Sequence, residues 1–467
     1  MPARSVVRTS SYHCSRRLAV ALPAALLAAA TLVPPAIAAQ PAADSAGAID
    51  LAAARALFAE AHRLAAADGG RLWGRTLDGP ILLADPATRA VVGSMPDTAG
   101  VLRPRDGVYV GPLPAEQNVA NTALAWGGRR WTMLIWPGVP GERYERNRLV
   151  AHELFHRVQE ELGLATPEGD NSHLDSEAGR AWLRLEWRAL AEALIRRGAE
   201  RRRATEDALA FRRHRHALFP DRVDDERALE LNEGLAEYTG LALSGLPPWV
   251  LADRAAVQLA SYDGRPSLVR SFAYASGPAY GVLLDEAGAR WRRGLTTAAD
   301  LGELLARATG IDVSGAEAEA ALLARAARYE GARVLAEERA RAERRAARLA
   351  DYRRRFLEGP TLALPAAGQF RYSFDPGGAE SLDGAGTVYP AARVTAAWGV
   401  LTVEHGGVLL QGGGGRVSQV VVPVATGAAG MAGAPLAGEG WRLELAPGWQ
   451  VVPDARRGSW RVVRGGG

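Results

Sequence analysis

The stretch AHELFHRVQEE, residues 151–161, places His152 and His156 four positions apart, with Glu153 directly after the first histidine. On an α-helix, residues four apart lie on the same face, so each imidazole can direct one nitrogen at a single metal ion. Glu153 is rotated by about 100° from His152, so its carboxylate can reach a water molecule at the metal without being a ligand. The stretch therefore predicts a helix that carries two metal ligands and a general base.

The alternative is that the motif arose by chance, which a chain of this composition produces with odds of about one in a hundred. The rest of the helix favours a real site, because it has an apolar face that can pack against a core. The members of that face are Leu149, Phe155, Val158 and Leu162. Histidines in the middle of such a helix need polar partners or a metal. A hydrolytic zinc site also needs a third protein ligand and an open position for water.

The third ligand is expected much later in the chain. A third histidine close behind the second, as in the pattern HExxHxxGxxH, is absent because the chain reads HELFHRVQEELG. The stretch LELNEGLAEYTG, residues 229–240, is a predicted helix that carries Glu233 and Glu237 one turn apart. A carboxylate from this helix would complete a site with two histidines and one glutamate.

The two stretches together resemble the gluzincin metallopeptidases of the MA clan, a group that includes thermolysin and zinc aminopeptidases. The resemblance rests on HELFH (152–156) and LNEGLAEY (231–238), and it extends through short motifs over roughly residues 100–290. It implies an α+β catalytic domain in which an antiparallel-rich sheet precedes a helical half. It also implies hydrolysis of peptide bonds with Zn²⁺ as cofactor.

The resemblance assigns a role to each residue of the two motifs. It implies that His152, His156 and Glu233 bind the zinc ion and that Glu237 orients one of the two histidines. The interval between His156 and Glu233 is much longer than is usual in the family. We interpret the helical stretch 174–217 within this interval as an insertion.

A tyrosine that stabilises the oxyanion is expected in YASGPAYG, residues 274–281. This segment is similar to the tyrosine segment of the zinc aminopeptidases, with Ser276 in place of their lysine. The resemblance implies that Tyr274 is the oxyanion-stabilising residue, and Tyr280 and Tyr238 are weaker candidates. An ordinary aromatic residue packed in the core is the open alternative for Tyr274.

Upstream of His152, the stretch AEQNVANTALAW (115–126) is a candidate for the edge strand that pairs with substrate. The family motif that holds the amino terminus of a substrate is absent from this part of the chain. Both endopeptidase and exopeptidase action therefore stay open.

Three other histidines are weaker candidates for metal ligands. His173 lies in a predicted loop before a helix. His214 and His216 are two residues apart, so they face different sides of a helix, and the arginines around them repel cations. We interpret the arginine runs at 196–203 and 212–215 as solvated faces or as faces paired with nearby acids.

Changes in composition divide the chain into successive parts. Residues 48–141 begin with a predicted helix and continue as short β-rich runs between turns, which indicates a mostly antiparallel sheet. Residues 142–316 are predicted to be helical and to carry the zinc site. One long helix is expected over 317–358, with mixed charges typical of a solvated connecting rod. Residues 361–467 are rich in glycine and in short Val, Trp and Tyr runs, which predicts a separate all-β module.

The N-terminal segment 1–39 has the pattern of a secretion signal, a basic start followed by an apolar run. Small residues at its end, AIAAQ (36–40), predict cleavage after Ala38 or Ala39. Pro23 interrupts the apolar run, which argues against a stable membrane anchor. We therefore expect an exported protein that is periplasmic or extracellular after cleavage.

Charge and cysteine content exclude several classes of function. The whole chain has 56 basic and 52 acidic residues, and removal of the signal removes four arginines and no acid. The mature chain is therefore formally neutral, which gives no support for nucleic-acid binding. The only cysteine, Cys14, lies in the signal, so the mature chain has no thiol ligand and no disulfide. The absence of lysine excludes Schiff-base and P-loop lysine chemistry.

The sequence thus predicts an exported zinc metallopeptidase that acts on peptide or protein substrates. Glu153 is the expected general base, and Tyr274 is the expected partner of the oxyanion. The alternative is a non-catalytic exported binding or scaffold protein of the same fold. In either case the C-terminal β module is a candidate for contact with the cell envelope. The presence of every catalytic residue type favours the enzyme.

Overall fold

The computed structural model describes most of the chain between Ile49 and Gly465. The described residues are 49–167, 169–312, 315, 317–366, 370–374, 378–382, 384–413, 416–424 and 436–465. The predicted export signal lies outside them. The described chain forms two compact units, one of which ends at Arg345 while the other begins at Ala346. No helix among the described residues has both the length and the apolar character needed to cross a membrane.

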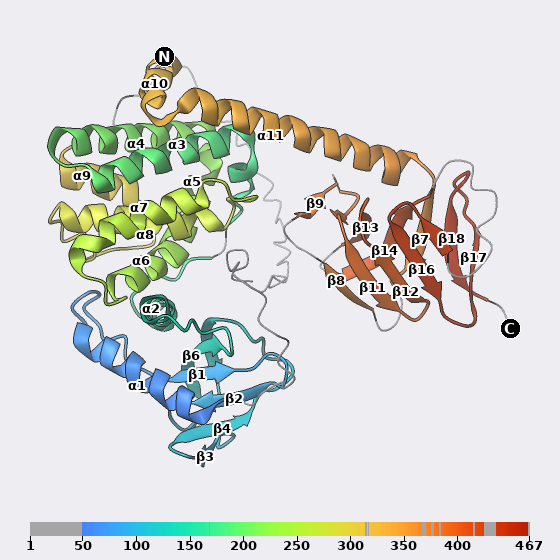
Figure 1. Ribbon diagram of the computed structural model, residues 1–467, viewed down its shortest axis with the longest axis horizontal. Helices are drawn as coiled ribbons and strands as arrows, with labels where there is room; N and C mark the ends of the chain where they lie inside the picture. The colour runs from blue at the N-terminus through green and yellow to red at the C-terminus, as the bar shows by residue number, and fades with distance from the viewer. Residues whose placement is uncertain are drawn as a thin grey trace, which may run out of the picture. The chain divides into compact units, whose positions relative to one another are not determined.

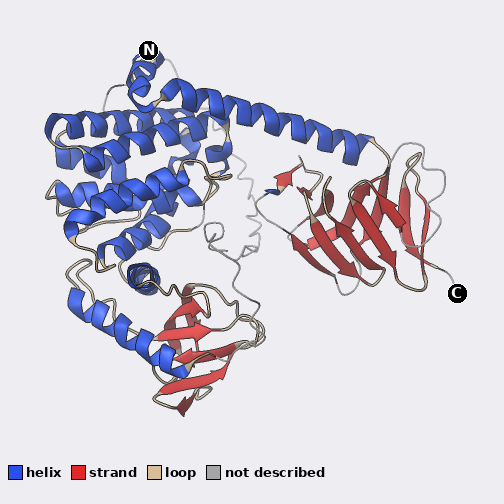
Figure 2. Ribbon diagram, viewed as in Figure 1, coloured by secondary structure: helices blue, strands red, loops and turns tan. Residues whose placement is uncertain are grey.

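The α+β class predicted from the sequence is confirmed. A six-stranded sheet comes first in the chain, a set of helices follows, and two β-sheets form the C-terminal part (Figure 2). The first unit contains both the six-stranded sheet and the helices of the predicted zinc site. The residues of the predicted site therefore all belong to this first unit, in which helix α2 lies between the sheet and helix α6 (Figure 1).

The N-terminal helix α1 (Leu51–Asp68) corresponds to the helix predicted at the start of this part. It begins at Asp50, whose Oδ1 accepts hydrogen bonds from the backbone N–H groups of Ala52 at 2.8 Å and Ala53 at 3.2 Å. It ends at Gly69, which adopts a left-handed conformation with φ of 56°. An aspartate that caps the first turn and a glycine that ends the last turn therefore define the two ends of α1.

The six-stranded sheet has the order β3-β4-β2-β1-β6-β5. Its strands are β1 (Ile81–Ala84), β2 (Ala90–Gly93), β3 (Arg103–Arg105), β4 (Val108–Pro112), β5 (Thr122–Trp126) and β6 (Arg129–Ile135). All neighbours pair in the antiparallel direction except β1 and β6, which are parallel. The expectation of a mostly antiparallel sheet is therefore confirmed, and β5 lies at one edge of the sheet.

The alternation of side chains along β1 places a core on each face of this sheet. Ile81 and Leu83 belong to the large core that the sheet shares with the helices. Leu82 and Ala84 point to the other face, where they join a smaller cluster with Trp131. Successive strand residues point to opposite faces, so this run of four buried apolar residues is explained by a sheet that is covered on both sides.

The helical part of the first unit meets the sheet through α2. Its α-helices are α2 (Arg143–Gln159), α3 (Glu177–Ile195), α4 (Gly198–Leu218), α5 (Val223–Leu229), α6 (Leu235–Ala242), α7 (Pro248–Tyr262), α8 (Ser271–Glu286), α9 (Leu301–Thr309) and α10 (Glu319–Ala326). Short 3₁₀ turns occur at Ser172–Asp175 (η1) and Pro220–Arg222 (η2), and a π-helical turn, η3 (Glu230–Gly234), joins α5 to α6. Helix α2 contacts strands β5 and β6 on one side and α6 on the other. The predicted motif helix is thus central to the unit.

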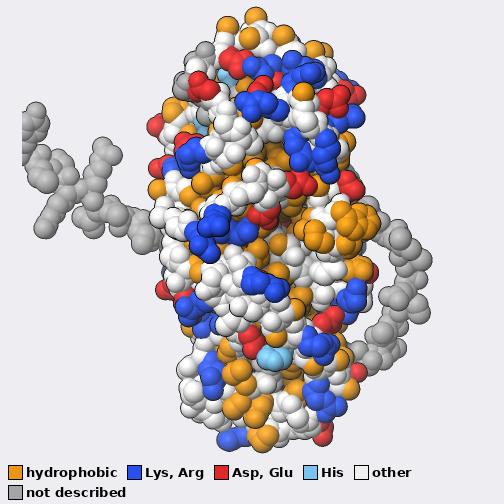
Figure 3. Space-filling view, turned by 90° about the vertical axis from the view of Figure 1, so that its left-hand side faces the viewer, with side chains coloured by type: hydrophobic (Ala, Val, Ile, Leu, Met, Phe, Trp, Pro, Cys, Tyr) orange, Lys and Arg blue, Asp and Glu red, His pale blue; other side chains and the backbone are white. Residues whose placement is uncertain are grey.

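The helices α3 and α4, which the sequence suggested as an insertion, are integral to the core. Trp182, Leu183 and Trp187 of α3 are almost fully buried, and α3 packs on α4, α7 and α8. Arginines of these helices are also buried, among them Arg212 and Arg215. Figure 3 shows that other arginine and acidic side chains are interspersed over the surface. Of the two interpretations of residues 212–215, pairing with nearby acids is confirmed for Arg212 and Arg215, which bind buried carboxylates, and a solvated face does not describe these two arginines.

The single long helix expected over 317–358 is instead divided. Helix α10 is followed by the 3₁₀ turn η4 (Ala327–Tyr329), and α11 (Gly331–Tyr352) then continues into the π-helical turn η5 (Arg353–Glu358). The break lies at Glu330, which has a φ of 58°. The Tyr329 hydroxyl donates a hydrogen bond to the buried Asp207 at 2.7 Å, so the chain turns where this side chain is anchored. Glu338 of α11 is likewise buried against Arg180, so the first half of α11 is packed and not a solvated rod.

The second unit is built from two sheets. One has seven strands in the order β17-β18-β7-β14-β13-β10-β9, and the other has five in the order β15-β16-β12-β11-β8. The strands are β7 (Thr361–Pro365), β8 (Arg371–Phe374), β9 (Glu380–Ser381), β10 (Thr387–Tyr389), β11 (Ala392–Ala396), β12 (Gly399–Val403), β13 (Val408–Gly413), β14 (Arg416–Pro423), β15 (Leu436–Gly438), β16 (Trp441–Leu445), β17 (Trp449–Pro453) and β18 (Trp460–Arg464). Trp398 and Trp441 lie in the core shared by both sheets.

We predict that a fragment beginning at Ala346 folds alone and is more stable than one beginning at Thr361. Tyr352 and Phe356 pack in a cluster with Leu382 on the seven-stranded sheet, and the shorter fragment lacks both aromatic rings. Loss of such contacts should lower the free energy of unfolding by at least about 3 kcal/mol. Urea unfolding of the two fragments, followed by tryptophan fluorescence, measures this difference. Equal stabilities would show that the helix end contributes nothing to the module.

Candidate metal centre

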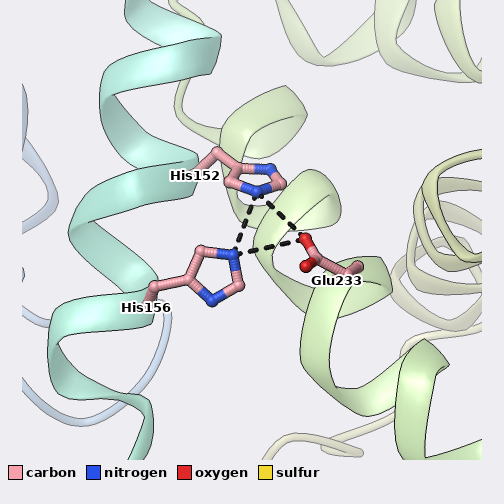
Figure 4. Close-up of side chains that lie close together, drawn as sticks. All are labelled: His152, His156 and Glu233. Carbon is pink, nitrogen blue, oxygen red and sulfur yellow. Dashed lines mark hydrogen bonds and ion pairs between the residues drawn. The ribbon is translucent and has the colours of Figure 1, made fainter. Parts of the chain in front are cut away.

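Helix α2 directs two imidazoles toward each other from successive turns. The Nε2 atoms of His152 and His156 are 3.1 Å apart, and the two rings are nearly perpendicular, with an interplanar angle of 70° (Figure 4). The helix begins at Glu142, whose carboxylate accepts a hydrogen bond from the backbone N–H of Glu145. Its face toward the core includes Leu154 and other apolar side chains. The predicted pairing of the two histidines on one helix face is therefore present.

The π-helical turn η3 brings Glu233 to the same point. Its Oε2 lies 3.5 Å from the Nε2 of His152 and 3.4 Å from the Nε2 of His156. The three ligand atoms lie within 4.8 Å of one another, and Glu233 is 9% exposed. The structure thus brings together the three residues that were predicted to bind the metal, although 76 residues of chain lie between His156 and Glu233.

The spacing of the three atoms fits a tetrahedral zinc ion. Ligand atoms about 2.0–2.1 Å from such an ion lie about 3.3–3.4 Å from one another. The observed separations of 3.1, 3.4 and 3.5 Å bracket this value. Two imidazole nitrogens and one carboxylate oxygen form a donor set that zinc accepts in catalytic sites. The residues present therefore fit a metal ion of this class.

Hydrogen bonds at the Nδ1 atoms orient both histidines for this role. The Nδ1 of His152 lies 3.0 Å from Oε2 of Glu237, and the Nδ1 of His156 lies 3.0 Å from Oε1 of Gln159. Both partners are acceptors, so each Nδ1 carries the proton and each Nε2 can present its lone pair to a metal. Glu237 thus lies where the sequence placed it, beside a histidine and not at the metal position.

Glu237 is held in turn by residues that the sequence analysis did not identify. The guanidinium of Arg148 donates a hydrogen bond to Oε1 of Glu237, and Nε2 of Gln258 donates another at 2.8 Å. Burial raises the pKa of Glu237, but Arg148 and His152 outweigh it and lower this pKa to about 2. Arg148 lies four residues before His152, and Gln159 lies three residues after His156. Helix periodicity could therefore have indicated both residues as neighbours of the histidines. No sequence signal pointed to Gln258.

The electrostatic environment favours positive charge at the point where the three ligand atoms meet. Burial lowers the pKa of His152, but hydrogen bonds to Glu233 and Glu237 outweigh it and raise this pKa to about 10. Burial also raises the pKa of Glu233, whereas the two histidines lower it and hold it well below its usual range. The carboxylates thus stabilise a cation in a place from which most water is excluded.

Glu153 lies beside the triad with an unused carboxylate oxygen. It is 5% exposed, and its Oε1 is 4.0 Å from the Nε2 of His152. Its buried Oε2 has no hydrogen-bond partner among the described residues. A buried polar atom without a partner costs free energy, so its presence calls for an explanation. Burial raises the pKa of Glu153, although the two histidines act in the opposite direction.

Tyr274 of α8 also reaches the triad. Its hydroxyl donates a hydrogen bond to Oε2 of Glu233 at 2.7 Å, and its ring stacks on His152 with an interplanar angle of 10°. Burial raises the pKa of Tyr274, and the charge of Glu233 raises it further. The hydroxyl therefore stays protonated and can act as a hydrogen-bond donor. The alternative was that Tyr274 is an ordinary aromatic residue packed in the core. Its hydrogen bond to Glu233 gives it a polar contact at the triad in addition to its packing.

The two weaker tyrosine candidates lie elsewhere. The Tyr280 hydroxyl donates to Oε1 of Glu186 at 2.6 Å, and the Tyr238 hydroxyl donates to Asp285. Both contacts are part of the packing between helices. Ser276, which stands where the zinc aminopeptidases have a lysine, accepts a hydrogen bond from the indole of Trp187 at 2.9 Å.

The three weaker histidine candidates do not join the site. His173 and His216 both approach the carboxylate of Glu226, at 2.7 and 3.3 Å, and His214 packs against the ring of Trp182. Among the residues that the structure describes, the triad is the group of three such side chains placed to hold a metal ion. Comparisons of the chain with known protein families, with curated proteins and with solved structures found no match.

Proposed function

We propose that the protein is an exported zinc-dependent metallopeptidase. The observation that carries this proposal is the position of Glu153, a buried carboxylate with an unpartnered oxygen beside a His₂Glu ligand set. His152, His156 and Glu233 would hold the ion. When bound, zinc supplies a Lewis acid and lowers the pKa of a coordinated water to about 7. The other roles in the reaction fall to residues of the chain.

Glu153 is suited to move the proton of the attacking water. Because Oε2 of Glu153 makes no hydrogen bond among the described residues, it is available to accept a proton from water. The same oxygen can then donate this proton to the amine that leaves when the peptide bond breaks. Burial raises the pKa of Glu153, which increases the tendency of its carboxylate to accept a proton.

Tyr274 is suited to stabilise the oxyanion that forms on the peptide carbonyl. Its protonated hydroxyl lies 2.7 Å from Oε2 of Glu233, within the group of ligand atoms. A rotation of the hydroxyl away from Glu233 would allow it to donate to the carbonyl oxygen of a substrate. The stacking of its ring on His152 restricts the position of the hydroxyl to the immediate surroundings of the site.

The edge strand β5 offers a place for an extended peptide. Among the described strands it pairs with β6 alone, through five residue pairs from Thr122 to Trp126. It also contacts α2, which carries the two histidines. An extended peptide can add to such an edge through backbone hydrogen bonds. Peptides and proteins are therefore the proposed substrates, and the C-terminal β unit is the proposed part for contact with the cell envelope.

We predict that the purified protein binds close to one zinc ion per chain and cleaves peptides only when zinc is present. A strong chelator should abolish cleavage, and added zinc should restore it, because the ligand residues remain in place without the ion. Elemental analysis by mass spectrometry and digestion of a peptide library measure the two properties.

The possible outcomes separate the peptidase from the scaffold alternative. Cleavage that survives complete removal of metal would contradict the proposed mechanism. Zinc binding without cleavage of any library member would assign the protein to the class of binding or scaffold proteins. Library members with blocked amino or carboxyl termini would also show whether the enzyme acts inside a chain or at its ends.

A further inference from the structure

Glu233 lies in a helical turn of unusual width. The π-helical turn η3 (Glu230–Gly234) interrupts an otherwise continuous run of α-helix from Val223 to Ala242. In an α-helix three residues advance by about 300°, so Glu230 and Glu233 would point to nearly the same side. A π turn holds more residues, so each residue advances less and the two side chains diverge. Glu233 faces the histidines of α2, whereas Glu230 faces α4.

Glu230 is held by both arms of one guanidinium. Nη1 and Nη2 of Arg212, on α4, donate hydrogen bonds to the two carboxylate oxygens of Glu230 at 2.9 and 2.6 Å. Arg212 is 3% exposed, and its Nη2 also donates to Asp300 at 2.8 Å. Such a bidentate pair fixes the orientation of the carboxylate as well as its distance. The first residue of the π turn is therefore tied to α4.

Arg212 is itself fixed by a network of buried charges. Glu186 of α3 lies 3.4 Å from Nη1 of Arg212 and also accepts hydrogen bonds from Arg215 and from the hydroxyl of Tyr280. Arg215 further donates to Glu226 at 2.7 Å. A buried ion network of this kind is weak evidence for stability, because apolar side chains of similar volume often stabilise a fold as well. Its best-attested use is to specify one arrangement of the chain.

Other contacts of the turn lead back to the metal ligands. The carbonyl of Leu231 accepts a hydrogen bond at 3.1 Å from Nε2 of Gln159, the residue that holds His156. Gly234 packs so closely on α8 that a Cβ at Gly277 would overlap its backbone. The turn is thus enclosed on the sides of α2 and α8, and the pair between Arg212 and Glu230 fixes it on the side of α4.

We propose that Arg212 is a positioning residue for the metal centre, because its pair with Glu230 fixes the π turn that presents Glu233 to the two histidines. The proposal rests on the proposed metal site. It gives the helices α3 and α4 a role in metal binding, although neither contributes a ligand. Without the pair, the turn is free to revert toward regular α-helix, which rotates Glu233 away from its place.

The test is the zinc affinity of a Glu230→Gln variant. This change preserves the size of the side chain and removes the charge that ties the π turn to Arg212. Burial raises the pKa of Glu230 to about 7, so the measurement is made at about pH 8, where the wild-type carboxylate is charged. Competition with a chromophoric chelator should show zinc binding weakened by at least about tenfold, as for other residues that support metal ligands.

A matched control separates positioning from general loss of stability. Asp207 lies on α4, the helix of Arg212, is fully buried, and accepts hydrogen bonds from Arg325, Arg328 and Tyr329. The Asp207→Asn variant makes the same kind of change away from the π turn and should bind zinc as tightly as the wild type. Thermal unfolding of both metal-free variants ensures that they are compared in the folded state.

Each outcome decides the proposal. Equal zinc affinity of Glu230→Gln and wild type would overturn it, and so would an equal loss in Asp207→Asn. If Glu230→Gln does not fold, Arg212→Lys is used, since it retains the charge but loses the bidentate contact and should weaken zinc binding in the same direction. Wild-type protein that binds no zinc would overturn the metal site itself, and the positioning role with it.

Discussion

Replacement of Glu153 by glutamine should leave zinc binding nearly unchanged and lower peptide hydrolysis by at least about a hundredfold, since general-base catalysis contributes about 10²–10⁴. The substitution retains the size of the side chain and all three proposed ligands. It removes no hydrogen bond of Oε2, because that oxygen has no partner among the described residues. An amide cannot accept the proton of the attacking water, so the chemical step fails while the metal stays bound. Zinc content and single-turnover cleavage of a fluorogenic peptide measure the two effects separately.

The control for this variant is the same chemical change at the end of the same helix. Glu160 follows the last residue of α2, and its side chain is 66% exposed in a surface ion pair with Arg130. The Glu160→Gln variant should retain hydrolysis, because exposed pairs of this kind contribute little to stability. Full activity in Glu153→Gln would mean that the HELFH motif is not the motif of a hydrolase. A loss of zinc in Glu153→Gln would mean that Glu153 is a ligand and not a base.

The proposed ligand residues could be predicted because their spacing follows helix geometry. His152 and His156 differ by four positions, as do Glu233 and Glu237. The structure gathers both histidines and Glu233 at one point and places Glu237 at the Nδ1 of His152, away from that point. Each pair lies on one helix face, which a local pattern is sufficient to show. The distribution of roles between Glu233 and Glu237 came from the resemblance to gluzincins, and the hydrogen bond from His152 to Glu237 agrees with it.

The surroundings of the ligands could not be predicted, because they depend on contacts between distant parts of the chain. Nothing in the composition of α3 and α4 indicates that Arg212 and Arg215 are buried, since arginines in a helix are usually solvated. The four carboxylates that neutralise them come from α3, α5, η3 and the residue before α9. The π turn at Glu230 has no local sequence signal, and it becomes intelligible only when Arg212 is seen beside it.

The same limit explains the differences in the fold. The parallel pairing of β1 with β6 depends on how the chain returns to the sheet, and periodicity along a single strand does not contain this information. The break at Glu330 lies directly before Gly331, a poor helix former, and it accompanies the anchoring of Tyr329 on Asp207. A single glycine is often tolerated inside a helix, so the position of the break depends on this tertiary contact as well.

Removal of the carboxylate ligand should have the largest effect on metal binding. In a Glu233→Ala variant, the ion would be held by two neutral histidines, and the only anionic ligand of the set would be absent. We expect zinc affinity to fall by more than about a hundredfold, which exceeds the about 10–100-fold effect of residues that only orient a ligand. Hydrolysis should be lost together with the metal. Equilibrium competition with a chromophoric chelator and a cleavage assay at saturating zinc measure both.

Glu237→Gln provides the comparison that tests the division of roles between the two glutamates. The amide oxygen can still accept the hydrogen bond from Nδ1 of His152, although the charge that faces Arg148 is removed. We therefore expect a weaker loss of zinc affinity, within about 10–100-fold. At saturating zinc this variant should retain measurable hydrolysis, whereas Glu233→Ala should not. The opposite order of the two affinities would place the metal one helical turn further along the chain, beside Glu237, and would contradict the arrangement of ligands proposed for this site.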